Sequence, residues 1–324
     1  MTRVAIIGTG LIGQSWAILH AIAGNDVHLW DGAAGVARAA AERIASQAGA
    51  LADSGLFDPA ATAGLSRRIT ACDTLAQACG EADFVQENTS ERLEVKRAVF
   101  RDLDAAAPAT AILASSTSGL LPSHFTDGLP GRDRCLVVHP LNPPHLVPAV
   151  EVVPAPWTRP DVVTQTAAML RALGKSPIVM QREIDGFVMN RLQGAILEEA
   201  FRLIEGGHAG AEDIDAALRD GLALRWSVMG PMETMDLNAP GGVRDYVARF
   251  DAMYATIHQG AGRRADWTGV ALDRIEAARR SRLPLAGFPA RQAWRDRRLA
   301  ALLRHLQTAD RDPPRPSTPE GTPT

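Results

Sequence analysis

Cysteine is scarce in this chain of 324 residues, and an excess of charge of one sign and long apolar runs are lacking. The three cysteines, Cys72, Cys79 and Cys135, are too few and wrongly spaced for a zinc site or a disulfide framework. We expect them to be small buried apolar groups in a reducing compartment. No apolar run reaches the roughly 18 residues that would indicate a membrane-spanning helix, so no membrane span is expected.

The charge balance excludes two further classes of partner. The chain carries 34 Lys and Arg against 37 Asp and Glu, which gives a formal net charge of -3. This balance offers no basic field for nucleic acid and no polybasic anchor for a membrane surface. No charged leader segment precedes the first predicted strand, and we expect a cytoplasmic protein without a metal site.

The sequence contains the pattern of a two-domain α/β protein. Residues 3–8 are almost continuously apolar and end in glycine, which predicts a buried strand. A helix is predicted over about residues 11–23 and a second strand over residues 27–30. This β-α-β unit predicts a Rossmann-type doubly wound sheet.

Further predicted elements continue the alternation and then give way to helices alone. The later segments are helices at 37–54 and 91–104 and strands at 84–87, 111–115, 136–139 and 150–153. From Asp185 onward the apolar spacing is helical, including residues 212–219, 242–258 and 292–306. We therefore predict a cofactor-binding domain over 1–184, an all-helical substrate and dimerisation domain over 185–308, and a disordered Pro-rich tail over 309–324.

A glycine-rich turn follows the first strand and predicts a dinucleotide site. Gly8 permits the tight turn, Gly10 lets the backbone approach a pyrophosphate, and Gly13 lets the helix pack close to the sheet. The amides of the first helical turn, which includes Leu11 and Ile12, would then face the phosphates. Asp31 at the end of the second strand can accept hydrogen bonds from both ribose hydroxyls and repels a 2′-phosphate. No Arg or Lys immediately follows it, which favours NAD over NADP.

A histidine and a glutamate downstream are candidates for acid–base chemistry. His139 ends a predicted strand at the edge of the sheet where such folds bind ligands. Glu151 lies in a Val-rich strand, where an unpaired carboxylate would be costly. A carboxylate bonded to one imidazole nitrogen leaves the other free to take a hydroxyl proton. The alternative of a structural imidazole and an edge carboxylate stays open on these residues alone.

Six motifs together resemble one family. In chain order they are Gly8-Thr9-Gly10-Leu11-Ile12-Gly13, Glu91 with Lys96, Ser115-Ser116-Thr117-Ser118, His139-Pro140-Leu141-Asn142-Pro143, Glu151, and Gly186-Phe187-Val188-Met189-Asn190-Arg191. They cover about residues 1–250 and resemble the 3-hydroxyacyl-CoA dehydrogenase superfamily. The resemblance implies an NAD-dependent dehydrogenase that forms a homodimer through its second domain.

The resemblance also implies a role for each matching residue. His139 matches the general base and Glu151 its partner, while Ser118 and Asn190 match the residues that bind the substrate oxygen. A second set matches positions that contact the cofactor, namely Glu91, Lys96, Ser116 and Asn142. The family often has Asn where Ser116 stands, so the chain departs from the family pattern at this position.

The second domain departs from the acyl-CoA enzymes. Residues 230–238 resemble the L-gulonate 3-dehydrogenase and lambda-crystallin branch, and L-carnitine dehydrogenases share the Arg225-Trp226-Ser227 part. The fork of Arg225 can bind a carboxylate, which a free 3-hydroxy acid has and a thioester lacks. We expect oxidation of a free 3-hydroxy acid, with L-gulonate to 3-dehydro-L-gulonate as the first candidate.

Three alternatives to that substrate remain. The chain could act on L-carnitine or another short 3-hydroxy acid, although its two tyrosines support an aromatic cage for a quaternary ammonium poorly. It could keep an acyl-CoA substrate. It could also be a crystallin-like structural protein that binds NAD without turnover, because fold alone never proves activity.

Overall fold

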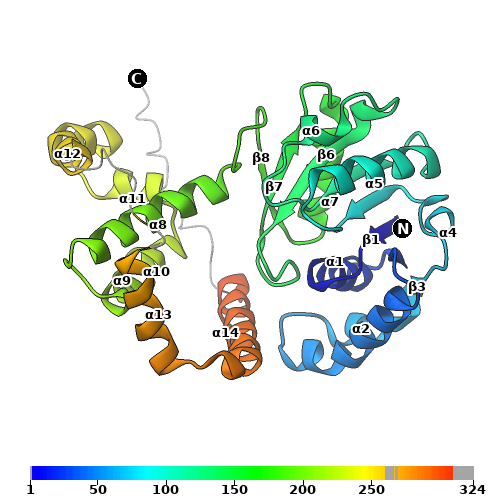
Figure 1. The fold of residues 1–324 in the computed structure, drawn as a ribbon, viewed down its shortest axis with the longest axis horizontal. Coiled ribbons are helices and arrows are strands. Elements are labelled where there is room, and N and C mark those ends of the chain that lie inside the picture. Colours follow the sequence, from blue (N-terminus) through cyan, green and yellow to red (C-terminus); the bar gives the residue numbers. More distant parts are fainter. Residues whose placement is uncertain (1, 260–265, 267–268, 309–324) are drawn as a thin grey trace, which may run out of the picture. The chain divides into compact units, whose positions relative to one another are not determined.

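The computed structural model describes residues 2–259, 266 and 269–308 (Figure 1). Contacts divide them into a first unit, residues 2–189 with the described residues from Ala293 onward, and a second unit, Asn190–Gln292. The predicted domain boundaries at 184 and 308 stay predictions. The tail predicted at 309–324 lies outside the described residues.

The first unit is built on an eight-stranded sheet with the order β3-β2-β1-β4-β5-β6-β7-β8. The strands are β1 Arg3–Ile7, β2 Asp26–Trp30, β3 Ile69–Ala71, β4 Phe84–Glu87, β5 Ile112–Ser115, β6 Cys135–Pro140, β7 Ala149–Pro154 and β8 Ser176–Val179. Neighbours pair in parallel except β6 with β7. A loop without a helix joins those two strands, and only antiparallel neighbours can be joined so directly.

Helices cover both faces of this sheet, which confirms the predicted doubly wound α/β fold. They are α1 Leu11–Ile22, α2 Val36–Asp53, α3 Pro59–Ala63, α4 Leu75–Cys79, α5 Leu93–Ala106, α6 Pro122–Thr126 and α7 Pro160–Ala172. Strand β1 shows how the core divides. Val4 and Ile6 join the cluster that contains α1 and α2 residues, whereas Ala5 and Ile7 join the cluster that contains α5 and α6 residues. Alternate side chains of a strand point to opposite faces, and both faces here are buried.

Some predicted features differ from the structure. The helix expected from residue 91 begins at Leu93, because Arg92 has extended backbone angles and serves as its N-cap. The helix expected over 212–219 becomes a π-turn from Ala217, with the poor helix former Gly221 inside that turn. Of the cysteines, Cys79 and Cys135 are buried and burial raises the pKa of both thiols to about 12, whereas Cys72 is partly exposed.

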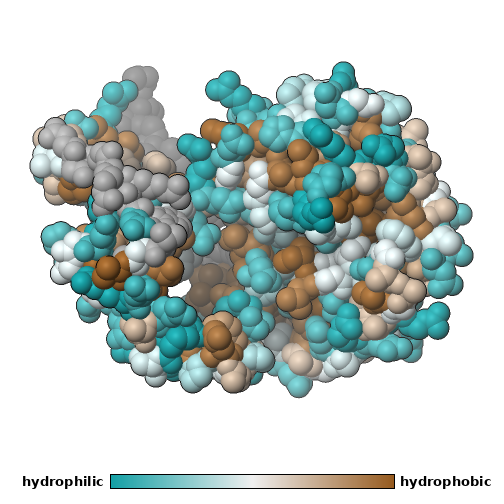
Figure 2. All heavy atoms as spheres, viewed as in Figure 1, coloured by the Kyte–Doolittle hydropathy of each residue, from teal (hydrophilic) through white to brown (hydrophobic). Residues whose placement is uncertain are grey.

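The described elements of the second unit are helical. They are α8 Met189–Glu205, α9 Ala211–Ala216, α10 Ala223–Trp226, α11 Pro231–Leu237, α12 Gly242–Gln259 and α13 Val270–Arg282. Helix α14, Phe288–Thr308, starts in this unit and continues into the first. Figure 2 shows apolar residues, in brown, on the viewed surface of both units. No helix among the described residues is long and apolar enough to cross a membrane.

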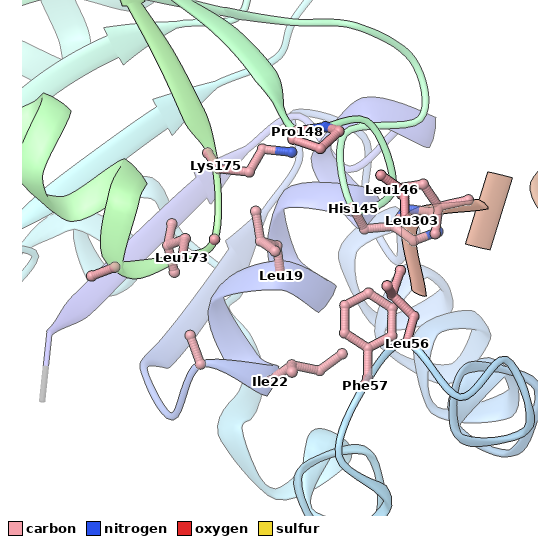
Figure 3. A pocket seen from close by; sticks show the side chains of 13 residues that line it. Leu19, Ile22, Leu56, Phe57, His145, Leu146, Pro148, Leu173, Lys175 and Leu303 are labelled. Atoms are coloured by element: carbon pink, nitrogen blue, oxygen red, sulfur yellow. The ribbon is translucent and has the colours of Figure 1, made fainter. Parts of the chain in front are cut away.

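A cavity of about 260 Å³ lies beside the second half of α1 (Figure 3). Its lining is mostly apolar and includes Leu19, Phe57 and Leu303, together with His145 and Lys175. The Lys175 ammonium donates to the carbonyls of Pro144 and Val147 in the loop between β6 and β7. Burial lowers the pKa of Lys175 to about 8. The lysine thereby holds the loop that connects the strands of His139 and Glu151.

Candidate active site at the carboxyl edge of the sheet

The antiparallel register of β6 and β7 brings His139 and Glu151 together. The two residues are direct cross-strand partners, and His139 Nδ1 lies 2.7 Å from Glu151 Oε2. Both side chains are buried, with 5% and 0% of their surface exposed. The antiparallel pairing therefore lets two residues that are twelve positions apart in the sequence share a hydrogen bond.

The second oxygen of Glu151 is held by the start of α8. Glu151 Oε1 accepts hydrogen bonds from the backbone N–H groups of Val188 at 2.7 Å and Met189 at 2.9 Å. Gly186 and Phe187 have positive φ angles of 76° and 51°, and this turn aims the two amides at the carboxylate. The Phe187 ring also packs on the His139 ring, with 5.5 Å between centroids.

These contacts keep the carboxylate charged. Burial by itself raises the pKa of Glu151. The hydrogen bonds from His139, Met189 and Val188, with the electrostatic effect of His139, outweigh burial and hold the pKa below its usual value. A charged Glu151 makes Nδ1 of His139 the protonated nitrogen, so Nε2 has the lone pair that a general base needs.

The glycine turn fits a dinucleotide. Gly8 has a φ of 84°, and a Cβ atom there would come within 2.8 Å of the Asn88 carbonyl group. A Cβ on Gly13 would lie 2.1 Å from the Gly8 carbonyl oxygen, so the helix can approach the turn only with glycine at this position. At Gly10 a Cβ would meet nothing within 4 Å. The space outside Gly10 and the first-turn amides of Leu11 and Ile12 is therefore open to a pyrophosphate.

Asp31 lies at the end of β2 beside this turn. Its Oδ2 accepts hydrogen bonds from the amide of Thr9 at 2.8 Å and from the Thr9 hydroxyl at 3.1 Å, while Oδ1 accepts from the Ala33 amide. The turn thus orients the carboxylate predicted to bind the ribose. The role of Thr9 in holding Asp31 was not predicted from the sequence, although its position between two motif glycines is a signal for it.

Glu91 and Ser118 are brought together as neighbours in adjoining loops. Glu91 Oε1 accepts hydrogen bonds from the Thr117 hydroxyl and from the backbone N–H groups of Ser118 at 3.1 Å and Gly119 at 3.3 Å. The loop that carries the exposed Ser118 side chain is therefore held by this carboxylate. The hydrogen bond from the Thr117 hydroxyl to Glu91 was not predicted from the sequence.

Lys96 is buried beside a second carboxylate, and its cofactor contact stays a prediction. Its side chain is 1% exposed, and its ammonium forms a salt bridge at 2.8 Å with Glu87, which is 0% exposed. It also donates to the Thr89 carbonyl at 3.1 Å. The pairing of Glu87 with Lys96 was not predicted from the sequence, although a carboxylate at the end of the apolar strand at 84–87 is a signal for it.

Ser116 and Asn142 occupy different settings. The Ser116 hydroxyl accepts from Trp16 at 3.1 Å and Gln86 at 2.7 Å and donates to Asn88 at 2.7 Å. In this network the Ser116 hydroxyl bonds to three side chains, and its cofactor contact stays a prediction. Asn142 lies exposed in the loop after β6.

The remaining predicted residues belong to the second unit. Asn190 lies in the first turn of α8, directly after the amide of Met189 that binds Glu151. Arg225 is exposed near the end of α10. In the same unit Tyr246 and Tyr254 share a hydrogen bond of 2.9 Å. That bond raises the pKa of Tyr246, and the positive charge of Arg225 opposes the shift, so Arg225 lies within electrostatic reach of this tyrosine.

Metal ligation has no support in the part of the chain that the structure describes. No group of three or more His, Cys, Asp or Glu side chains there could hold a metal ion.

Comparison with known proteins places this site in context. The family model of the 3-hydroxyacyl-CoA dehydrogenase NAD-binding domain matches residues 3–184. The family model of the C-terminal domain matches residues 186–277. Lambda-crystallin of Oryctolagus cuniculus is 38% identical over 310 residues, which cover 94% of this chain and 97% of that protein. L-carnitine dehydrogenase of Streptomyces griseus is 41% identical over 249 residues, or 76% of this chain and 73% of that protein.

A solved structure is also similar. The crystal structure of 5-formyl-3-hydroxy-2-methylpyridine 4-carboxylic acid 5-dehydrogenase, an NAD+-dependent dismutase, superimposes with a TM-score of 0.79 at 28% identity. The match covers 96% of this chain and 100% of that one.

Proposed function

Because this chain belongs to the 3-hydroxyacyl-CoA dehydrogenase family and NAD is its cofactor, we propose that it oxidises the 3-hydroxyl group of a free 3-hydroxy acid, with L-gulonate as the first candidate. The observation that carries the proposal is the buried His139–Glu151 pair with its two backbone donors. This arrangement supplies a base of defined tautomer at the edge of the sheet where ligands bind.

The chain's own residues would hold the cofactor and move the proton. Gly8, Gly10 and Gly13 with the first-turn amides of α1 would hold the pyrophosphate, and Asp31 the ribose. When bound, NAD supplies the acceptor for the hydride from C3. His139 Nε2 takes the hydroxyl proton, and the negative charge of Glu151 stabilises the imidazolium that results. Ser118 and Asn190 would hydrogen-bond the substrate oxygen.

The substrate class rests on Arg225. An exposed guanidinium can bind a carboxylate through two charge-assisted hydrogen bonds, and a free hydroxy acid provides that group. The resemblance of residues 230–238 to the L-gulonate 3-dehydrogenase branch favours a polyhydroxylated acid. The product would be a 3-keto acid.

L-carnitine is the second candidate, and one observation favours it. Both tyrosines of the chain lie side by side through their hydroxyls, and the Tyr246 ring packs on Phe250 with 4.7 Å between centroids. Because Arg225 lies within electrostatic reach of Tyr246, these aromatic rings support binding of a substrate that carries both a carboxylate and a quaternary ammonium. The 41% identity to an L-carnitine dehydrogenase agrees with this candidate.

A substrate screen tests the proposal. Purified protein is mixed with NAD or NADP and with L-gulonate, L-carnitine, 3-hydroxybutyrate or 3-hydroxybutyryl-CoA, and absorbance of the reduced cofactor is followed. We expect turnover of a free acid with NAD. Greater activity on the thioester than on every free acid would overturn the substrate class, and NAD binding without turnover of any of them would favour a crystallin-like role.

We also propose that two copies associate through the second unit, in the cytoplasm. Leu192, Leu224, Val228, Met232 and Leu237 are apolar, yet each exposes between 62% and 70% of its surface. So many exposed apolar side chains on one small unit are typical of a protein interface. The family resemblance points to a second copy of this chain as the partner.

A further inference from the structure

The carboxylate of Glu87 joins three separate segments beside the proposed active site. Its Oε1 accepts hydrogen bonds from the amide and the hydroxyl of Thr89, both at 2.5 Å, and from Lys96 Nζ at 2.8 Å. Its Oε2 accepts from Lys96 Nζ at 2.9 Å and from the Ser115 hydroxyl at 2.6 Å. The donors come from the loop after β4, from α5 and from the end of β5.

Stability alone is a weak reason for such a pair. Removing a carboxylate and an ammonium from water carries a large desolvation cost. Apolar residues of similar volume often stabilise a core at least as much as a buried ion pair does. What the pair offers, and apolar residues do not, is directed bonds that define where each donor lies. Those donors all lie where β4 and β5 end, at the edge that carries the proposed chemistry.

One end of the Ser118 loop bonds to Glu87 directly, and the other end bonds to Glu91 nearby in the chain. Ser115, at the start of the loop, donates directly to Glu87. At the other end the loop is held by Glu91, which lies in the same short connection as Thr89. A displaced Thr89 would therefore shift the residue that holds Ser118.

The glycine turn of the cofactor site meets the same connection. The position of a Cβ on Gly8 lies 2.8 Å from the Asn88 carbonyl and 3.1 Å from the Thr89 amide nitrogen, so these backbones pack in direct contact. The Thr89 amide is also a donor to Glu87. One buried carboxylate thus holds a backbone segment that contacts both the cofactor turn and the substrate loop.

We propose that Glu87 and Lys96 form a positioning pair that sets the geometry of the glycine turn and the Ser118 loop for the reaction. This inference rests on the proposed function. It gives Lys96 a role that acts through Glu87 and Thr89, whether or not its ammonium also contacts the cofactor. Misplacement of reacting groups by about 1 Å can lower a rate about 10²-fold. Loss of a pair that positions these groups can therefore lower the rate substantially.

The test compares two buried ion pairs of the same unit. Glu87→Gln and the double variant Glu87→Leu/Lys96→Met alter the proposed pair. Asp104→Asn alters the matched control, because Asp104 pairs with Arg134 at 2.8 Å and the two side chains are only 8% and 4% exposed. Arg134 precedes β6, at the opposite edge of the sheet. Each variant is assayed for Tm, for Kd of NAD by calorimetry, and for kcat and KM.

The expected results differ between the pairs. Both Glu87 variants should raise the Kd for NAD and lower kcat by about 10- to 10²-fold each, measured well below Tm. Asp104→Asn should lower Tm and leave Kd and kcat within about twofold of the wild type, because its loss is the general cost of an unpaired buried charge. The double variant removes both charges and should keep a Tm near that of the wild type.

Three results would overturn the positioning role. They are a folded Glu87→Gln with unchanged Kd and kcat, a stable and fully active double variant, and an Asp104→Asn that loses NAD affinity as strongly as Glu87→Gln. The NAD measurement keeps this test apart from that of the proposed function. A wild type that binds NAD but oxidises no hydroxy acid would refute the substrate class and leave the Kd comparison intact.

Discussion

At the scale of single residues, three contacts of the Glu151 carboxylate define the geometry of the pair of His139 and Glu151. One oxygen of Glu151 contacts the imidazole and the other accepts hydrogen bonds from two backbone amides, so the two oxygens have different partners. Replacement of Glu151 by Gln would keep an acceptor for the amides but would place an NH2 group against Nδ1. That nitrogen would then have to accept, and Nε2 would be the protonated one.

We expect His139→Ala and Glu151→Gln each to lower kcat by about 10²- to 10⁴-fold, because the first removes the base and the second selects its wrong tautomer. Steady-state kinetics with the best substrate of the screen gives the magnitude. Calorimetry with NAD is the control, since neither side chain is assigned to the cofactor. Near-normal turnover of His139→Ala would remove it from the role of base.

A second residue-scale prediction concerns His20, which is buried between Trp16 and Phe84. Burial lowers the pKa of His20 from 6.5 to about 4. Between these values the unfolded chain binds a proton that the folded chain does not, so stability falls as the pH drops from 6.5 to 4, by at most about 3 kcal/mol.

Urea unfolding between pH 7 and pH 4 checks this prediction. His20→Phe keeps an aromatic ring but removes the proton site, so its free energy of unfolding should depend less steeply on pH. Some acid sensitivity should remain, because burial also lowers the pKa of His145 to about 4. His124→Ala, which removes an exposed imidazole, is the control. Parallel pH profiles for the wild type and His20→Phe would contradict the assignment.

At the scale of elements, the junction of β1 with α1 separates packing from ligand binding. Gly13→Ala would force a Cβ to 2.1 Å from the Gly8 carbonyl oxygen, whereas a Cβ at Gly10 meets nothing within 4 Å. The first substitution damages the fold of the turn. The second only occupies space in front of it, where the pyrophosphate is expected.

We expect Gly13→Ala to lower Tm and to weaken NAD binding. Gly10→Ala should keep the wild-type Tm while the Kd for NAD rises by about tenfold or more, since the phosphates need close approach to this backbone. Thermal unfolding and calorimetry measure the two quantities. Gly49→Ala, inside α2 with nothing within 4 Å of the new Cβ, controls for helix propensity. Unchanged NAD affinity in Gly10→Ala would place the cofactor elsewhere.

At the scale of the whole molecule, the exposed apolar side chains of the second unit predict a homodimer. Light scattering after size-exclusion chromatography should give about twice the chain mass of 34.6 kDa. Met232→Lys and Leu224→Lys should shift the mass toward one chain, because a buried lysine without a partner is costly in an interface. Arg38→Glu in α2 of the first unit is a charge control. A monomeric wild type at micromolar concentration would refute the dimer.

Local sequence could predict part of this molecule because some determinants lie close together in the chain. The turn from Gly8 to Gly13 and the apolar strands depend on neighbours within a few residues, and the structure contains them where they were predicted. The residues alone left the nature of His139 and Glu151 open, and the family resemblance implied that they form a pair. The antiparallel register of β6 and β7 brings the two side chains together. The amides of Val188 and Met189 came from a segment 37 and 38 residues away.

The sequence by itself determined the α/β fold, the dinucleotide turn with its preference for NAD, and the family. Backbone conformation and strand burial follow from local residue pattern, and these features need little else. Only the tertiary structure decided that Lys96 pairs with Glu87, that Ser116 belongs to a network with Trp16, and that Glu91 holds the Ser118 loop. A buried polar group takes whichever partner the packing of distant segments brings within hydrogen-bonding distance, and no local pattern specifies that partner.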